Sequence, residues 1–328
     1  MSHPKRRSMR ALAKELGVSP ATVSRIASGI GSFSEETEEK VTQALLREGY
    51  RIGADPDPSP QTVAAIVTDL SNEVYHSILT ALGRYLKRKG FLLQIFTENQ
   101  DQRLLLHQVE ALHVSGLFLI GTPLAPVSEE ASVPAVQVLS GNAVSWQGQV
   151  YTVFSDEYVG GRLAARCLLE KGCRLPIILN NRHTSSADSR RIQGFLSEWT
   201  EEGLSAASIY LHDGEPFKSA FNSAHDITAY LKAKGQPFDS VFACSDWRAY
   251  GAIVALRSLH VAVPEKVKVI GFDGERVSRY CDLPFTTIQQ NPDMIASAAF
   301  ETLCALMEGK YPAASTLVPV QVQKGLTV

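Results

Sequence analysis

Apolar positions in the first 50 residues recur at helical spacing in three short stretches. In the first stretch they are Met9, Leu12, Ala13 and Leu16. Ser8 stands at the capping position before this stretch, and Gly17 follows it, where a left-handed residue commonly ends a helix. The pattern predicts a short amphipathic helix.

A second helix is predicted to begin after Ser19, a favoured cap, with Pro20 in the first turn, where no N–H is needed. Val23 and Ile26 would face inward. The opposite face carries small or polar side chains, from Ser19, Pro20, Ala21, Thr22, Ser24 and Arg25. Such a face fits a major groove, where Arg25 can reach guanine or phosphate and the hydroxyls can bond backbone oxygens.

A third helix is predicted from Ser34, with Glu35 and Glu36 at the positive end of its dipole. Its apolar stripe contains Val41, Ala44, Leu45 and Tyr50. The three helices predict a DNA-binding helix-turn-helix domain over residues 1–52. The alternative is an ordinary three-helix segment of a larger domain.

The amino-terminal end is the basic part of the chain. Residues 1–25 contain six Lys or Arg residues, Arg10 among them, and one Glu, whereas the whole chain has a net charge of −2. These cations would neutralise phosphates, and the attraction would weaken with salt. Arg10 is therefore predicted to contact double-stranded DNA, in addition to the residues of the second helix.

Residues 53–61 form a predicted linker, because Pro56, Pro58 and Pro60 remove donors and disfavour helix before them. From residue 62 onward, apolar runs alternate with helical patterns. Strands are predicted over 62–68, 91–96, 116–121, 133–138, 150–154, 175–179, 208–211, 240–244 and 266–272, and helices near 74–89, 101–113, 157–171, 189–202, 217–234 and 247–260.

Near-continuous apolar strands that alternate with helices predict α/β architecture with parallel sheets covered on both faces. The strands are too many for one open sheet, so we expect two lobes with a ligand crevice at the carboxyl ends of their strands. A chain of 328 residues with 45% hydrophobic composition can bury cores of this size. The body is expected to span 62–328.

The cysteines, the histidines and the length of the apolar runs bear on metal binding, disulfides and membrane insertion. The five cysteines are odd in number, widely spaced and without a C-x-x-C pair, and the histidines show no metal-ligand spacing, so we expect free thiols and no metal or cofactor. No apolar run reaches the roughly 18 residues of a membrane span. A cytoplasmic protein with no membrane partner is expected.

Polar residues that follow the predicted strands are the candidate ligand contacts, because they would point into the crevice. They are Asp69, Asn72, Tyr75, His76, Asp156, Arg191, Phe217, Ser245, Asp246, Trp247 and Asp273. A guanidinium can fork onto vicinal hydroxyls or a carboxylate, and an aspartate beside a tryptophan suits a polyol. This set predicts a small polar ligand.

Several candidates also have a structural alternative. Asp69, Asp156 and Asp246 could cap the helices that follow them. Arg191 could belong to a surface ion pair, and the rings of Trp247 and Phe217 could pack in the core.

The run LAKELGVSPATVSRIASG, followed by FSEETEEKVTQALLREGY, closely resembles the head of the lactose-repressor (LacI/GalR) family of bacterial transcription regulators. The resemblance continues through GLFLIGT, SRRIQGF, VFACSDWRAYGA, KVIGFD and PFTTIQQ, in that order. It implies that Arg191 and Asp273 contact the ligand. It also implies two periplasmic-binding-protein-like lobes, the first over about 62–156 and 287–314 and the second over about 157–286 and 315–328.

The resemblance further implies a regulator, expected to be a repressor, whose operator affinity responds to a sugar or sugar derivative in the inter-lobe cleft. A homodimer would place two heads on a two-fold axis and read a pseudo-palindromic operator. In the cell such a protein would be associated with the nucleoid.

The chain departs from the family pattern after Tyr50, where family members that bend DNA carry a hinge helix with a leucine wedge. Residues 51–62 are acidic and broken by prolines, so they offer neither a helix nor a wedge. We expect weaker DNA bending than is usual in the family, with specificity drawn mainly from the major groove, and a gel-mobility bending assay can measure this. Pro20 and Ala21 lie at base-reading positions of the family, and they would read bases by van der Waals contact.

Three other functions compete with this one. A binding protein for sugar uptake would share the two lobes, but the basic head argues against it. An enzyme is not expected, because G-x-S-x-G, P-loop and G-x-G-x-x-G patterns are missing. The third is a regulator with an altered DNA mode that responds to a protein or a non-sugar ligand.

Overall fold

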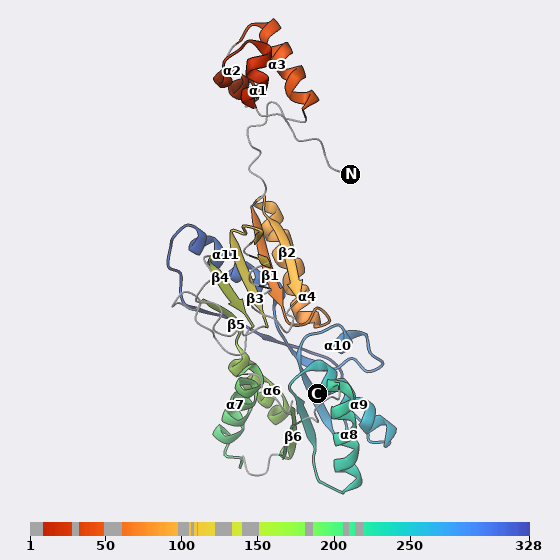
Figure 1. Ribbon diagram of the computed structural model, residues 1–328. Helices are drawn as coiled ribbons and strands as arrows, with labels where there is room; N and C mark the ends of the chain where they lie inside the picture. The colour runs from red at the N-terminus through yellow and green to blue at the C-terminus, as the bar shows by residue number, and fades with distance from the viewer. Residues whose placement is uncertain are drawn as a thin grey trace. The chain divides into compact units, whose positions relative to one another are not determined.

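A computed structural model describes residues 9–27, 33–48, 61–97, 105, 108–109, 111–121, 133–139, 151–180, 186–205, 210–213 and 219–328. The chain divides into two compact units, Met1–Gln61 and Thr62–Val328 (Figure 1). Several predicted features lie outside the described residues: the Ser8 cap, Tyr50, Phe217, the linker over 53–61 and most of the helix near 101–113.

The first unit contains the three predicted helices, α1 (Met9–Leu16), α2 (Pro20–Ala27) and α3 (Glu35–Arg47). Val23, Val41 and Leu45 are completely buried, and Leu12 and Ile26 complete the centre of this small core. The helical spacing of apolar residues therefore placed the inward faces correctly.

Three residues mark the predicted helix ends of the head: Gly17 after α1, Ser19 before α2 and Ser34 before α3. Gly17 has φ +67° at the end of α1, and the Ser19 hydroxyl accepts the Thr22 N–H at 3.0 Å. Ser34 occupies the position before α3, but its hydroxyl bonds the Thr37 hydroxyl at 2.7 Å rather than a backbone amide. The predicted start of α3 is thus confirmed, and the Ser34 side chain makes no cap bond to the helix backbone.

The first lobe of the body is a sheet with strand order β11-β5-β4-β3-β1-β2. Its strands are β1 (Thr62–Val67), β2 (Leu92–Thr97), β3 (Gly116–Ile120), β4 (Ala135–Val138), β5 (Thr152–Ser155) and β11 (Ser315–Val318). Helices α4 (Glu73–Arg88) and α11 (Pro292–Met307) pack on one face of this sheet and share its core (Figure 1). All the pairs in this sheet are parallel, as the apolar runs predict.

The second lobe is a sheet with strand order β12-β10-β9-β8-β6-β7. Its strands are β6 (Pro176–Asn180), β7 (Tyr210–Asp213), β8 (Ser240–Ala243), β9 (Lys268–Asp273), β10 (Thr286–Gln289) and the antiparallel β12 (Gln321–Gln323). Its helices are α6 (Glu157–Glu170), α7 (Ser186–Glu201), α8 (Ala220–Ala233), α9 (Asp246–Ser258) and the short α10 (Val277–Tyr280). Separate cores formed with α6 and α7 and with α8 and α9 cover its two faces.

The predicted lobe boundaries are wrong near the carboxyl end of the chain. β10 belongs to the second sheet, where Thr286 pairs with Ile270, and β11 belongs to the first, where Ser315 pairs with Thr152. Each strand is only four residues long. The predicted boundaries come from the family resemblance, whereas the sheet that each short strand joins depends on its contacts with distant segments of this chain.

Burial separates central strands from the edge. Every residue of β3 and β6 is buried, whereas Leu92 and Ile95 on the edge strand β2 are 55% and 45% exposed.

Among the helices that the structure describes, none combines the length and the apolar character needed to cross a bilayer.

Candidate functional site

The exposed face of α2 is the candidate DNA-contacting surface of the head. Ser19, Pro20, Ala21, Ser24 and Arg25 are exposed, and Thr22 is half-buried. The Ser19 and Thr22 hydroxyls share a hydrogen bond of 2.9 Å while Ser19 also caps the helix. Arg10 lies on α1. The predicted face is therefore small, polar and accessible.

In the body, two predicted ligand contacts serve as helix caps. Asn72 Oδ1 accepts the N–H groups of Val74 and Tyr75 at 3.0 and 3.1 Å, and Asp156 Oδ1 accepts the Val159 N–H at 3.1 Å. The cap alternative is thus confirmed for Asp156.

Asp69 makes a turn rather than a cap, since its Oδ1 accepts the Ser71 N–H at 2.8 Å and the Ser71 hydroxyl at 2.7 Å. It remains exposed. The cap alternative for Asp69 is therefore wrong.

Asp246 is completely buried, which excludes the direct ligand contact predicted for it. Its Oδ2 accepts the Glu275 N–H at 2.7 Å and its Oδ1 accepts the Thr287 hydroxyl at 2.5 Å. Burial, and then the nearby Asp273 carboxylate, raise the pKa of Asp246 well above its usual range. The carboxyl group ties α9 to the loop after β9, so its role is also not that of a helix cap.

The aromatic candidates do not line a common pocket in the described residues. Trp247 is 46% exposed and meets Tyr250 edge-on at 6.3 Å, so the core alternative for it is wrong. Tyr75 packs its ring against Gly121, where an added Cβ would come within 2.5 Å of the ring. The half-buried Ser245 accepts a hydrogen bond from Arg248 Nη1 at 2.8 Å.

Arg191 is the centre of a buried polar cluster in the second lobe. Its Nε and Nη2 both donate to the Glu157 carboxylate, the latter at 3.2 Å, and its Nη1 donates to the Cys244 carbonyl at 2.5 Å. Nη2 also lies 3.1 Å from Asp273 Oδ1, and the guanidinium stacks 3.8 Å from the Phe272 ring centroid. The surface ion-pair alternative for Arg191 is therefore wrong, because the side chain is 7% exposed.

The close contact of α6 and α7 sets the positions of Glu157 and Arg191. A Cβ on Gly161 would lie 1.9 Å from the Arg191 carbonyl oxygen, and a Cβ on Gly194 would lie 1.9 Å from the Tyr158 carbonyl oxygen. Only glycine allows backbones to approach so closely. Glu157 on α6 and Arg191 on α7 are thereby held within bonding distance.

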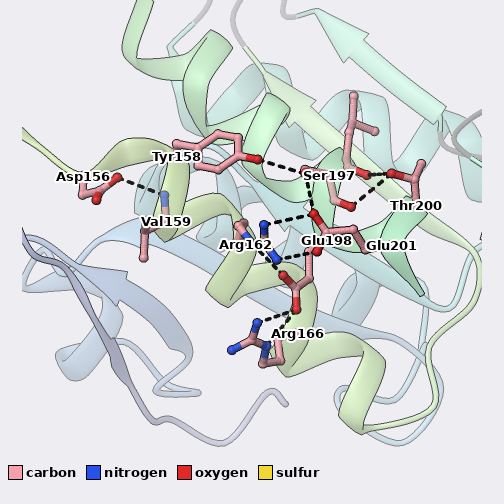
Figure 2. Close-up of polar contacts among 10 residues, drawn as sticks. Asp156, Tyr158, Val159, Arg162, Arg166, Ser197, Glu198, Thr200 and Glu201 are labelled. Atoms are coloured by element: carbon pink, nitrogen blue, oxygen red, sulfur yellow. Dashed lines mark hydrogen bonds and ion pairs between the residues drawn. The ribbon is translucent and has the colours of Figure 1, made fainter. Parts of the chain in front are cut away.

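A second ion-pair network joins the outer parts of the same helices, as Figure 2 shows. Arg162 and Arg166 both bind the buried Glu198, at 2.7 Å in each case, and Arg162 also binds Glu201 at 2.5 Å. The hydrogen bond from Arg162 lowers the pKa of Glu201. This network holds the register of α6 against α7.

A cavity of about 450 Å³ opens between the two lobes. The first lobe contributes residues of α4, among them Glu73 and His76, and the second contributes Asp273, Glu275 and Gln290. Of the predicted ligand residues, His76 and Asp273 line this cavity. The described residues hold no cluster of three or more His, Cys, Asp or Glu side chains suited to a metal ion.

Glu73, Glu275 and Gln290 are residues of this cavity that the sequence analysis missed. Gln290 Nε2 donates to Asp273 Oδ1 at 2.8 Å, and its Oε1 accepts the Ser155 hydroxyl at 2.5 Å, so it links the ends of β9 and β5. Its position at the end of the run PFTTIQQ, directly after the strand, was a signal that could have found it.

Asp273 adopts a backbone conformation that L residues rarely occupy, with φ 118°. Gly274 follows with φ +78°, and a Cβ there would come within 2.6 Å of Gln289. Strained residues of this kind cluster at ligand sites, where surrounding contacts hold them. The bonds from Arg191 and Gln290 supply such contacts.

Two protein families match the chain. The periplasmic binding protein-like domain matches residues 165–328, and a helix-turn-helix family matches residues 4–45. Among solved structures, the lac repressor dimer bound to operator and an anti-inducer is similar, with a TM-score of 0.75 at 22% identity over 98% of this chain and 99% of that chain. The complex of the transcriptional regulator CelR with cellobiose has a TM-score of 0.72 at 24% identity over 98% of this chain and 100% of that chain.

Curated relatives cover nearly the same length. The transcriptional regulator GalS of Salmonella typhimurium (strain LT2) is 27% identical, over 89% of this chain and 88% of GalS. The transcriptional repressor PurR of Vibrio vulnificus is 25% identical, over 91% of each chain. These relatives are regulators rather than enzymes, as expected. The chain belongs to the LacI/GalR family of transcription regulators.

Proposed function

We propose that this chain is a repressor that binds double-stranded operator DNA through α2 and responds to a small polar ligand held between the lobes of its body. One observation carries the proposal: the body has a cavity whose walls come from both lobes, in a chain whose separate head exposes a groove-sized polar helix face. A ligand that contacts both lobes binds one lobe arrangement best and so changes the population of that arrangement.

A carbohydrate is the favoured ligand class. The CelR structure is a complex with cellobiose, and another similar regulator, from Enterococcus faecium, was solved with bound ribose. His76, Asp273 and Gln290 supply hydrogen-bonding groups of the kind that recognise hydroxyls. The predicted roles of Asp69 and Tyr75 in ligand binding stay within this proposal.

A homodimer is the favoured assembly. The similar lac repressor structure is a dimer bound to its operator. Two copies of this chain on a two-fold axis would present two α2 helices to a pseudo-palindromic site. Arg25, Ser24 and Thr22 would then reach base edges or phosphates in each half-site.

Selection of genomic fragments by the purified full chain, followed by fluorescence anisotropy, tests the function. We expect selected fragments to share an inverted repeat and binding to change when a sugar that raises the Tm is added. Deletion of residues 1–61 should abolish DNA binding and leave the sugar-induced Tm shift. Failure to select any fragment at low salt, with and without sugars, would overturn the proposal.

A further inference from the structure

The two lobes of the body are joined mainly where the chain crosses between them, after β5, after β10 and after β11. Every pair of described elements that packs extensively lies within one lobe. At the crossings, the Asp156 N–H donates to the Val318 carbonyl at 2.8 Å, and the Ser155 hydroxyl donates to Gln290 Oε1 at 2.5 Å. A few crossing segments between two separately packed bodies allow one lobe to rotate against the other.

Glu73, the first residue of α4, makes a contact from the first lobe to the second. Both of its carboxylate oxygens lie 3.2 Å from the backbone nitrogen of Arg276, whose N–H they accept. The Arg276 Nε also approaches Glu73 Oε1, at 3.9 Å. Both residues line the cavity, so this contact joins the two lobes at the cavity wall.

The second lobe holds the Arg276 amide in place through the residues around it. The chain turns at Asp273, where φ is 118°, and the Glu275 N–H donates to the buried Asp246 carboxyl at 2.7 Å. The N–H and hydroxyl of Ser278 both donate to the Glu275 carbonyl, at 3.0 and 2.7 Å. Because this loop is fixed by its own lobe, Glu73 binds a donor whose position moves with the second lobe as a whole.

The neighbouring Glu275 does not oppose this contact at neutral pH. Burial, and then the Asp273 and Glu73 carboxylates, raise the pKa of Glu275 to about 8, against a smaller opposing effect of Arg191. Glu275 therefore keeps a proton at neutral pH and places no second negative charge beside Glu73.

Two other polar contacts at the rim of the cavity lie within single lobes. Arg84 of α4 pairs with Asp293 of α11 in the first lobe, and both side chains are exposed. In the second lobe, Arg279 Nε donates to Gln323 Oε1 at 2.6 Å. Loss of either contact would leave the bond from Glu73 to Arg276 intact, so these pairs provide a control for the inter-lobe contact.

We propose that Glu73 is a latch, which holds the two lobes in one arrangement before any ligand binds by accepting the Arg276 N–H. A contact made in one lobe arrangement and lost in the others raises the population of the first. The latch acts in the ligand-free body, so it depends on neither the proposed ligand nor the proposed operator. A ligand that favours the latched arrangement would bind more tightly than it does to a body whose lobes move freely.

Distances between spin labels on the two lobes of the full chain test the latch. The nitroxides are attached to p-acetylphenylalanine in place of the exposed Lys87 of α4 and the exposed Lys234 after α8. Labelled chain is mixed with a large excess of unlabelled chain, so that only distances within one copy are measured by double electron–electron resonance. Glu73→Ala should raise the fraction of molecules outside the parent's main distance peak by at least about threefold, because a hydrogen bond to a charged group is lost.

Glu73→Gln keeps the side-chain size and an acceptor oxygen without the charge, so it should give a smaller increase than Glu73→Ala. Asp293→Ala removes the rim ion pair within the first lobe and should reproduce the distances of the parent. Unchanged distances in both Glu73 variants would overturn the proposal. An equal increase in Asp293→Ala would do the same, since it would show that any change at the rim loosens the lobes.

Discussion

Arg191 on α7 and Glu157 on α6 form a two-pronged ion pair whose side chains are only 7% and 5% exposed. The same guanidinium reaches the Cys244 carbonyl after β8 and Asp273 at the end of β9. One side chain thus connects two helices to the ends of two strands at the inter-lobe cavity. Burial makes each partner dependent on the other, because an unpaired buried charge is strongly unfavourable.

Removal of Glu157 alone should destabilise the body strongly. We expect Glu157→Ala to lower the free energy of unfolding by about 3 kcal/mol, because it leaves Arg191 buried without its main counter-ion. Urea unfolding followed by circular dichroism measures this loss. The double variant Glu157→Leu with Arg191→Met should recover much of the loss, and a Glu157→Ala effect below about 1 kcal/mol would show that the pair is dispensable.

Gly161→Ala should force α6 and α7 apart. Its methyl group would lie 1.9 Å from the Arg191 carbonyl oxygen, so the backbone must move. We expect a loss of more than about 2 kcal/mol in the free energy of unfolding. Gly83→Ala is the matched control. Gly83 lies within α4, and its added methyl group would meet only Leu93 of β2, at 3.9 Å, so this substitution should leave stability unchanged or raise it. Equal effects of the two substitutions would refute the close contact.

Glu275 should make stability fall as the pH rises. Its pKa is about 8 in the folded chain against an ordinary 4.5, so between these values the folded chain holds a proton that the unfolded chain has lost. Stability is therefore lost as the pH rises through this window. Glu275→Gln cannot ionise, and its gain over the parent should grow from near zero at about pH 4.5 to at least about 1 kcal/mol at pH 8.

Urea unfolding of Glu275→Gln and the parent across this pH range measures that gain. Glu265→Gln should follow the parent at every pH, because that side chain is exposed. A stability difference between Glu275→Gln and the parent that stays constant across the window would contradict the raised pKa.

Arg25→Ala should weaken operator binding and reduce its salt dependence. Arg25 is exposed on the candidate DNA-contacting face of α2, and loss of one phosphate contact should lower the slope of log K against log salt by about 1. If Arg25 reads a base, the affinity should fall with relaxed selectivity at one position instead. Anisotropy titrations at several salt concentrations distinguish these cases. Lys40→Ala on α3, where Lys40 pairs with Glu36, should leave DNA binding unchanged.

Much of the fold could be predicted from the sequence, because its signals are local. The caps at Ser19 and Asp156, the turn at Gly17 and the inward faces of α1 and α2 each depend on residues a few positions apart. The apolar runs GLFLIG and LPIIL predicted buried parallel strands for the same reason, since a strand that is buried on both faces is apolar at nearly every position. The order of the helices and strands, and with it the fold class, could be predicted from these local signals.

Tertiary structure alone decided which distant groups meet. Asp246 and Asp273 both follow apolar strands in the sequence, yet the structure buries the first completely and places the second at the cavity. The partners of Arg191 and the sheets of β10 and β11 likewise depend on segments far apart in the chain. Side-chain burial and strand pairing are set by the packing of the whole lobe, and a local sequence pattern cannot predict that packing.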